Sequence, residues 1–303
     1  MVDKTYPILE GQLKKLRDMG DGSFAEIKAV VGLVRSVDTG EYEFADGHHN
    51  MPHMVDYRTA IGLGKVSGHR VLRATGRRDA LSAAVAGDDI WNGTATSLVY
   101  PNQTTGEQLS FVSTSANDAA AGTNVQQIDI HGLRLGGIEA YERITLNGVT
   151  PVNSTVTDWI FAQYLHTQRI PSGDIGTTAA GDIACYRTGD ATRVYLVIKA
   201  GGNVSLNAQR MIPADSSFYC EYIMATATSQ KPISVRIRAT CDYEGVLTPG
   251  IFIFNEVFEL DGSGIAMSMS IPRKFPPGCI IKATAYSSQA GGTAAVSYGG
   301  WLE

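Results

Sequence analysis

Three histidines in the run HHNMPH (His48, His49 and His53) have the most obvious chemical capacity, since each could offer an imidazole nitrogen to a metal ion. Pro52 interrupts the local geometry, and no cysteine or carboxylate completes a recognised ligand set. The run is therefore expected to be a solvated loop. The remaining histidines stand alone in the sequence and are expected to be structural or surface residues, so no metal site is predicted. They are His69, His131 and His166.

Paired carboxylates at Asp88 and Asp89, just before Ile90 and Trp91, could perform acid–base work on a sugar. Adjacent strand residues point to opposite faces, so these two carboxylates cannot readily flank one bond. We expect Trp91 to anchor a core and one aspartate to cap a turn.

Two further motifs fail as catalytic or cofactor sites. The stretch Ser113–Asp118 offers hydroxyls and a carboxylate but lacks a G-x-S-x-G elbow and a histidine partner in pattern. The glycines of Gly62–Gly68 lack the spacing of phosphate-binding loops, and a strand-like segment follows them instead of a helix. The sequence therefore predicts no catalytic residue, no cofactor and no enzyme activity.

Three tryptophans are the candidate ligand-contact residues: Trp91, Trp159 and Trp301. Trp159 and Phe161 lie two positions apart and would share one face of a strand, as a sugar-stacking platform requires. Core packing is the favoured alternative, because buried aromatic side chains dominate the cores of β proteins.

Composition excludes several classes of protein. Of 303 residues, 44% are apolar and only 18% are charged, and the net charge of −5 opposes direct nucleic-acid binding. No run of about 18 apolar residues indicates a membrane span, and the N-terminus lacks the apolar core of a signal peptide. We expect a chain kept in a cytoplasm until assembly, with its four spaced cysteines buried as free thiols.

The positioning elements are predicted to be a short N-terminal helix, an extended arm and many strands. Leu9, Leu13 and Leu16 recur at helical spacing, and Gly20 follows as a possible C-cap. Residues 38–68 show no regular element. From residue 68 onward, short strand-like runs alternate with turn signals such as Asn147-Gly148.

The clearest strand is residues 232–241, where positions 233, 235, 237, 239 and 241 are apolar and alternate with Ser, Arg, Arg and Thr. Several such strands predict an all-β protein with two β-sandwich or jelly-roll-like domains. The expected parts are residues 1–68 (helix and docking arm), 69–200 (first β domain) and 201–303 (C-terminal β-sandwich domain).

Several segments resemble a group of structural proteins from tailed-bacteriophage virions. The opening LRDMGDGSFAEIKAV carries their GDGS-x-AE pattern, and the most characteristic words lie within residues 87–152. Residues 31–68 match no pattern of the group. The matching stretches are Leu16–Val30, Gly87–Asn92, Leu109–Asp118, Ala121–Thr123, Ile128–Leu133, Glu142–Val152, Ile212–Ala214, Pro272–Gly278 and Ile280–Ser288.

The resemblance implies a non-catalytic part of a particle: a capsid decoration or head fibre, or a neck or tail component. We favour the head, because a compact chain lacks the length of a receptor-reaching fibre. The expected partners are copies of itself in a homotrimer or other symmetric oligomer, and other virion proteins such as the major capsid protein, without membrane contact. The expected location is the virion, assembled in the bacterial cytoplasm.

Two alternatives remain open. A carbohydrate- or host-receptor-binding module of a tail or fibre would show an exposed aromatic patch at one of the tryptophans. A glycan-cleaving tail enzyme would need two carboxylates about 5–10 Å apart in a groove, and the sequence shows no sign of one.

Overall fold

The computed structural model describes residues 57–228 and 232–303, together with five short strands before them. The chain divides into two compact units, Met1–Ser67 and Gly68–Glu303. In the first unit β1 (Lys4–Ile8), β2 (Gln12–Asp18) and β3 (Phe24–Ile27) form one antiparallel sheet. The same unit also contains β4 (Leu33–Arg35), which pairs with β5 (Tyr42–Phe44), and the six-residue helix α1 (Tyr57–Gly62).

The helix predicted within residues 1–20 is wrong, because this segment forms the β1–β2 hairpin, in which Pro7 lies opposite Leu13. The prediction rested on the leucine spacing and neglected two helix breakers. Pro7 cannot donate a helical hydrogen bond, and Gly11 costs about 1 kcal/mol inside a helix. The elements β5 and α1 also fall in the segment 38–68, where the sequence showed none.

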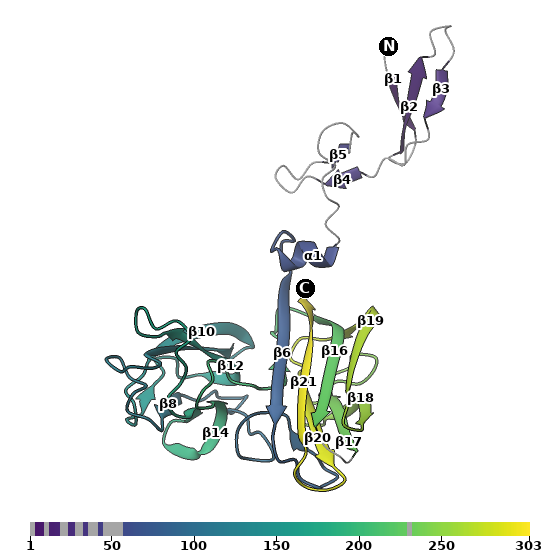
Figure 1. Cartoon of the computed structure of the whole chain (residues 1–303). Helices are drawn as coiled ribbons and strands as arrows, with labels where there is room; N and C mark the ends of the chain where they lie inside the picture. Colours follow the sequence, from purple (N-terminus) through teal and green to yellow (C-terminus); the bar gives the residue numbers. More distant parts are fainter. Residues whose placement is uncertain are drawn as a thin grey trace. The chain divides into compact units, whose positions relative to one another are not determined.

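One pair of sheets in the second unit is built from residues 109–198 (teal in Figure 1). The first sheet has the order β10 (Ile138–Thr145), β9 (Gln127–Arg134), β12 (Trp159–Arg169). The second has the order β11 (Val152–Asn153), β8 (Leu109–Ser113), β13 (Ile183–Arg187), β14 (Asp190–Ile198). Apolar residues from both sheets bury one another, including Phe111, Ile130 and Trp159.

A second pair of sheets encloses a larger core. One sheet has the order β15 (Gln209–Met211), β20 (Ile280–Ser287), β17 (Ile233–Ala239), β18 (Ile253–Leu260), with β7 (Asp88–Asp89) also on β20. The other has the order β19 (Gly264–Phe275), β16 (Phe218–Thr228), β21 (Thr293–Leu302), β6 (Arg70–Arg78). Both sheets contribute to the core, for example Val235, Phe218 and Tyr298.

The all-β prediction is confirmed, since antiparallel pairing joins the strands of these sheets. On β17 the predicted alternation is seen directly, with Ile233, Val235, Ile237 and Ala239 in the core. However, β6 and β7 belong to the second pair of sheets, although the sequence assigned them to the domain of residues 69–200. Figure 1 shows the reason, because β6 lies beside the C-terminal strand β21 and completes its sheet. The jelly-roll connectivity stays a prediction.

The four cysteines are buried and free, as the sequence predicted. Burial raises the pKa of the Cys220 thiol to about 12, so this thiol stays protonated at neutral pH. Across the described residues, no helix has the length and apolar character needed to cross a membrane.

A buried arginine joins the two pairs of sheets. Arg210 on β15 is only 6% exposed, and its guanidinium donates to four backbone carbonyls, those of Arg73, Gln163, Asn207 and Gln209. Its Nε donates to the Arg73 oxygen on β6 at 3.0 Å, and its Nη1 donates to the Gln163 oxygen on β12 at 2.9 Å. It also donates to Asn207 in the preceding segment. Burial lowers the pKa of Arg210, but a guanidinium stays charged at neutral pH.

The side chain of Gln163 strengthens the same junction. Its amide nitrogen donates to the Met211 oxygen at 2.6 Å, and its amide oxygen accepts from the Met211 nitrogen at 3.3 Å. The backbone of β15 is thus bound from β12 on the other pair of sheets. Polar groups that are buried and satisfied in this way leave little freedom for the two pairs to separate.

We expect Arg210→Met to lower the free energy of unfolding by roughly 2–4 kcal/mol, because it strands several buried carbonyls without a donor. Urea denaturation of the full chain measures this loss. The matched control is Arg77→Met, whose exposed side chain pairs with Asp79 and should contribute less than about 1 kcal/mol. Equal losses in the two variants would contradict the role given to Arg210.

Candidate functional site

Polar and aromatic side chains gather on the outer face of the sheet β10–β9–β12. On β9, Ile128 and Ile130 point into the core, so the alternate residues Asp129 and His131 lie on the opposite face. Strand register then builds two rows across the sheet. One row is Tyr141–His131–Tyr164, and the other is Arg143–Asp129–His166.

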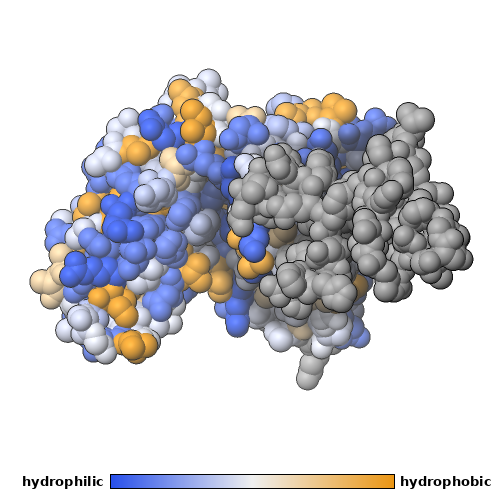
Figure 2. Space-filling view, turned by 90° about the horizontal axis from the view of Figure 1, so that it is seen from above, coloured by the Kyte–Doolittle hydropathy of each residue, from blue (hydrophilic) through white to orange (hydrophobic). Residues whose placement is uncertain are grey.

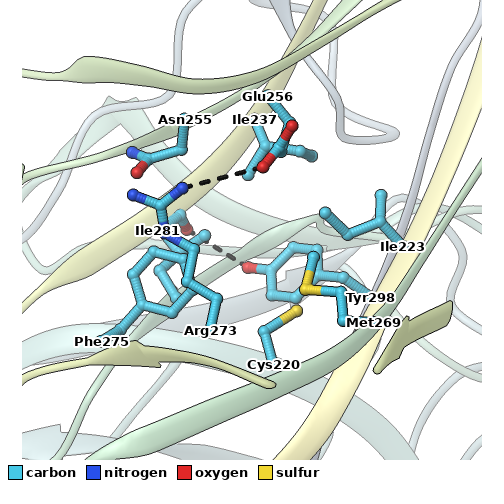
Figure 3. Close-up of a pocket in the computed structure, with 10 residues that line it drawn as sticks. All are labelled: Cys220, Ile223, Ile237, Asn255, Glu256, Met269, Arg273, Phe275, Ile281 and Tyr298. Carbon is cyan, nitrogen blue, oxygen red and sulfur yellow. Dashed lines mark hydrogen bonds and ion pairs between the residues drawn. The ribbon is translucent and has the colours of Figure 1, made fainter. Parts of the chain in front are cut away.

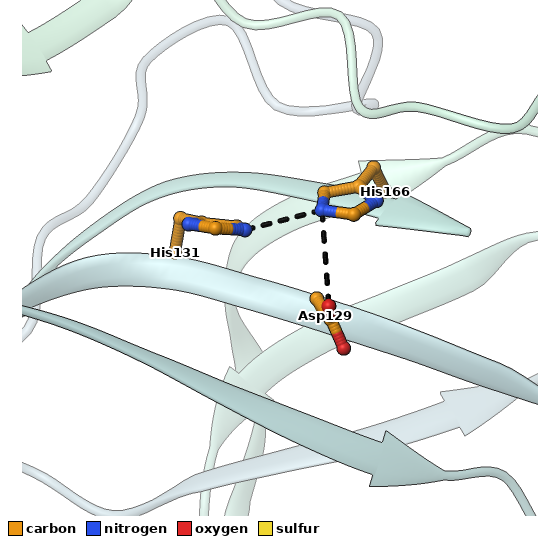
Figure 4. A group of neighbouring side chains, drawn as sticks. All are labelled: Asp129, His131 and His166. Atoms are coloured by element: carbon orange, nitrogen blue, oxygen red, sulfur yellow. Dashed lines mark hydrogen bonds and ion pairs between the residues drawn. The ribbon is translucent and has the colours of Figure 1, made fainter. Parts of the chain in front are cut away.

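The two histidines face each other at close range. His131 Nε2 and His166 Nε2 are 3.1 Å apart, and Figure 4 shows the rings pointing toward one another. His166 Nδ1 lies 3.2 Å from the Thr167 carbonyl oxygen, which only accepts, so Nδ1 carries the proton and Nε2 presents a lone pair. Burial, followed by the neighbouring His166, lowers the pKa of His131, which keeps this imidazole neutral at physiological pH.

Asp129 supplies the negative charge of the cluster. Its side chain is almost fully buried, and it receives both arms of Arg143, at 2.9 Å to Oδ1 and 3.1 Å to Oδ2. The Oδ2 atom also lies 4.0 Å from His166 Nε2. The Arg143 side chain is 48% exposed. Arg143 therefore binds the Asp129 carboxylate from the solvent side, and its side chain is free to change rotamer.

Aromatic rings fix the position of His131. Its ring stacks on Tyr164 at 4.5 Å and on Tyr141 at 5.8 Å between centroids. On the buried side of this stack, the Arg210 guanidinium lies 5.4 Å from the centre of the Tyr164 ring. On the solvent side, Tyr141 is 68% exposed. The cluster therefore has a rigid buried back and an open side.

The three candidate tryptophans do not form this site. Trp91 and Trp159 are buried, and Trp301, only 8% exposed, stacks on Tyr219. The three indoles therefore form no exposed aromatic patch, and their burial fits the core packing that the sequence analysis favoured. Trp159 packs in the core between the sheets of residues 109–198, and Trp91 packs with Leu98 and Val197.

The acidic residues that the sequence singled out are structural, as expected. Asp88 accepts from the Ser82 hydroxyl at 2.6 Å, while Asp89 accepts from the Leu98 nitrogen at 2.7 Å and pairs with Lys282. Asp118 accepts from Ser113 and from the Gly181 nitrogen, which holds two loops together. The HHNMPH run lies outside the described residues.

Sequence reasoning treated His131 and His166 as isolated, and the structure brings them together. They are 35 residues apart, on neighbouring strands. The sequence did contain one signal for this site. In each of two strand-like segments, a histidine stands two positions after another polar or aromatic residue, which places both on the same face of the strand: Asp129-x-His131 and Tyr164-x-His166. Strand pairing is not visible in one sequence, so the two segments could not be joined.

A narrow cavity lies in the core of the second pair of sheets, and the side chains that line it serve mainly to pack that core (Figure 3). Arg273 at its rim is 3.7 Å from Glu256, and the hydroxyl of Tyr298 donates to the Ile281 oxygen. The side chains around it are mainly apolar, so it offers no cluster of ligand atoms. They are Cys220, Ile223, Ile237, Asn255, Glu256, Met269, Arg273, Phe275, Ile281 and Tyr298.

No family model matches the chain, and neither does any curated protein. Among solved structures, the chain is similar to a chain in the structure of the Gx strain of infectious bursal disease virus. The identity is 12% and the TM-score is 0.19, over 77% of this chain and 71% of that one. A mutant VP2 protein in T=1 particles from that virus gives 9% identity and a TM-score of 0.14 over 78% and 73%. These TM-scores are too low to support any conclusion about fold or function.

The buried tryptophans give a direct optical prediction. In the folded chain, acrylamide and iodide should quench tryptophan fluorescence only weakly, and the emission maximum should lie to the blue of the unfolded chain. Stern–Volmer titration with and without denaturant measures both. Strong iodide quenching of the folded protein would mean that at least one indole is exposed, as the receptor-binding alternative requires.

Proposed function

We propose that this chain is a non-enzymatic structural subunit of a virus particle that assembles with copies of itself through one edge of its second pair of sheets. The bacteriophage setting is taken from the resemblance of residues 87–152 to tailed-phage virion proteins. The observation that carries the assembly proposal is the concentration of exposed apolar side chains in residues 243–271.

Eight of the twenty large apolar side chains that are exposed in the described residues lie in this short region. On the face that Figure 2 shows, apolar residues lie in small groups among polar ones. Contiguous exposed apolar surface marks interaction sites more often than single residues do. The eight are Tyr243, Val246, Leu247, Ile251, Phe254, Val257, Ile265 and Ile271.

The region is also the open edge of both sheets. Strand β18 ends one sheet and β19 ends the other, and the Glu256–Arg273 ion pair brings the two strands together. Edge strands invite pairing with further chains unless something blocks them. Here the β16–β19 pairing breaks between Cys220 and Tyr222, and Pro272 lies in the irregular part of β19. This interruption opposes endless strand addition and favours contact through side chains.

A second copy of this chain is the occupant that we propose for the edge. A closed symmetric oligomer uses one patch on every subunit, and covering it removes the exposed apolar groups in all copies. The small share of charged residues, 18%, fits a surface that lies against neighbours. Capsid decoration is our preferred position in the particle, with a neck or tail position as the alternative.

Light scattering after size exclusion tests the assembly. We expect a mass that is a multiple of the 32.4 kDa chain, and a lower mass for the double variant Val257→Glu, Ile271→Glu, because buried carboxylates oppose association. The matched control is Val149→Glu with Ile175→Glu, which changes two exposed residues of the same types outside the edge and should leave the mass unchanged.

A wild-type chain that stays monomeric at all concentrations, or an edge variant that keeps the full mass, would contradict the assembly proposal. Co-sedimentation with purified phage heads tests the position in the particle, and saturable binding is expected. An oligomer that ignores heads but binds tails would move the subunit to the neck or tail. Selective binding to a glycan array would instead favour the receptor-binding alternative.

A further inference from the structure

We propose that Asp129, His131 and His166 form a binding site for a divalent transition-metal ion of the zinc class. Each residue offers one ligand atom, and all three atoms lie within 4.8 Å of one another on the adjacent strands β9 and β12 (Figure 4). Two imidazoles and one carboxylate form a ligand set common in such sites. This proposal does not depend on the assembly described above.

The distance between the imidazoles suits one shared ion. With Nε2 atoms 3.1 Å apart, an ion about 2.0–2.1 Å from each nitrogen makes an N–metal–N angle of about 100°, close to tetrahedral. The ion then lies off the line between the nitrogens. Without an ion, the two nitrogens share one hydrogen bond, in which His131 Nε2 donates to the lone pair of His166 Nε2. To bind the ion, His131 carries its proton on Nδ1 instead.

Surrounding groups already hold both imidazoles in the ligand orientation. The hydrogen bond from His166 Nδ1 to the Thr167 oxygen fixes the tautomer in which Nε2 is free to coordinate. The tyrosine stack on both faces of His131 restrains that ring. A site prepared in this way loses little side-chain entropy when an ion binds.

Asp129 can contribute Oδ2 while Oδ1 keeps its bond from Arg143 Nε. The ion must then compete with Arg143 Nη2 for Oδ2, and the half-exposed arginine can withdraw that arm into solvent. The positive charge of Arg143 opposes the ion, which limits affinity. Two nitrogen donors select zinc, cobalt, nickel or copper over magnesium and calcium, which prefer oxygen.

The fourth position faces the open side near Tyr141, where water can complete the coordination. An ion there would cross-link β9 and β12 on the sheet face opposite the core. Because the ligands are preformed only in the folded chain, binding should stabilise the fold.

The experiment uses the full chain, freed of metal by a chelator, with His48, His49 and His53 all replaced by alanine. This background removes the other histidine group that could bind metal. We titrate it with Co²⁺ and follow the visible d–d absorption together with the bound metal per chain. One Co²⁺ per chain is expected, displaced by Zn²⁺, with a rise in melting temperature on Zn²⁺ addition.

On the same background, His166→Gln should weaken Co²⁺ binding by about tenfold or more, and the matched control His69→Gln should leave it unchanged. Absence of stoichiometric binding in the background chain, or unchanged binding in His166→Gln, would overturn the proposal. Imidazole NMR signals give a readout that needs no site variant. Zn²⁺ must change the imidazole chemical shifts of His131 and His166. A titration that leaves these chemical shifts unchanged also overturns the proposed site.

Discussion

The arrangement of residues 68–303 depends on one buried cation. Arg210 has no carboxylate among the groups that accept its hydrogen bonds, and backbone carbonyls of β6, β12 and the segment before β15 take that role. A guanidinium is suited to this because its several donors point in fixed directions and its charge strengthens each bond. Removing it would leave buried acceptors unpaired, a larger cost than the net value of the bonds themselves.

The same junction positions the candidate metal ligands. Gln163, whose side chain binds Met211, precedes Tyr164 on β12, and Tyr164 is stacked between Arg210 and His131. Nearby, β6 lies so close to the backbone of Ile90 that a Cβ at Gly76 would be 2.4 Å from the Ile90 oxygen. On β12, the hydrogen bonds that Gln163 makes with Met211 and Arg210 restrain the strand, and the stack of Tyr164 on His131 extends this restraint to the imidazole pair.

Local pattern was enough for the fold class and for the core of single strands. The alternation from Ile233 to Ala239 predicted the buried face of β17, and the isolated cysteines predicted buried thiols. It failed at β1–β2, where leucine spacing outweighed Pro7 and Gly11, and at β6, whose partner lies at the other end of the chain. The histidine site depends on the register of β9 with β12, and bulges at three places shift that register. Such long-range pairing is set by packing, which no local pattern records.

The two proposed sites lie on different sheets and differ in chemistry, so association and metal binding should depend on different residues and conditions. The apolar edge belongs to β18 and β19 of the second pair of sheets, whereas the histidine cluster lies on β9 and β12 of the first. Association through apolar side chains depends weakly on salt or chelators, because no ion pair has to be broken across the interface. Metal binding depends on neutral imidazoles and on the balance between Arg143 and the ion for Asp129. Loss of one property therefore need not remove the other, and an oligomer that survives chelation would reflect this division of the surface.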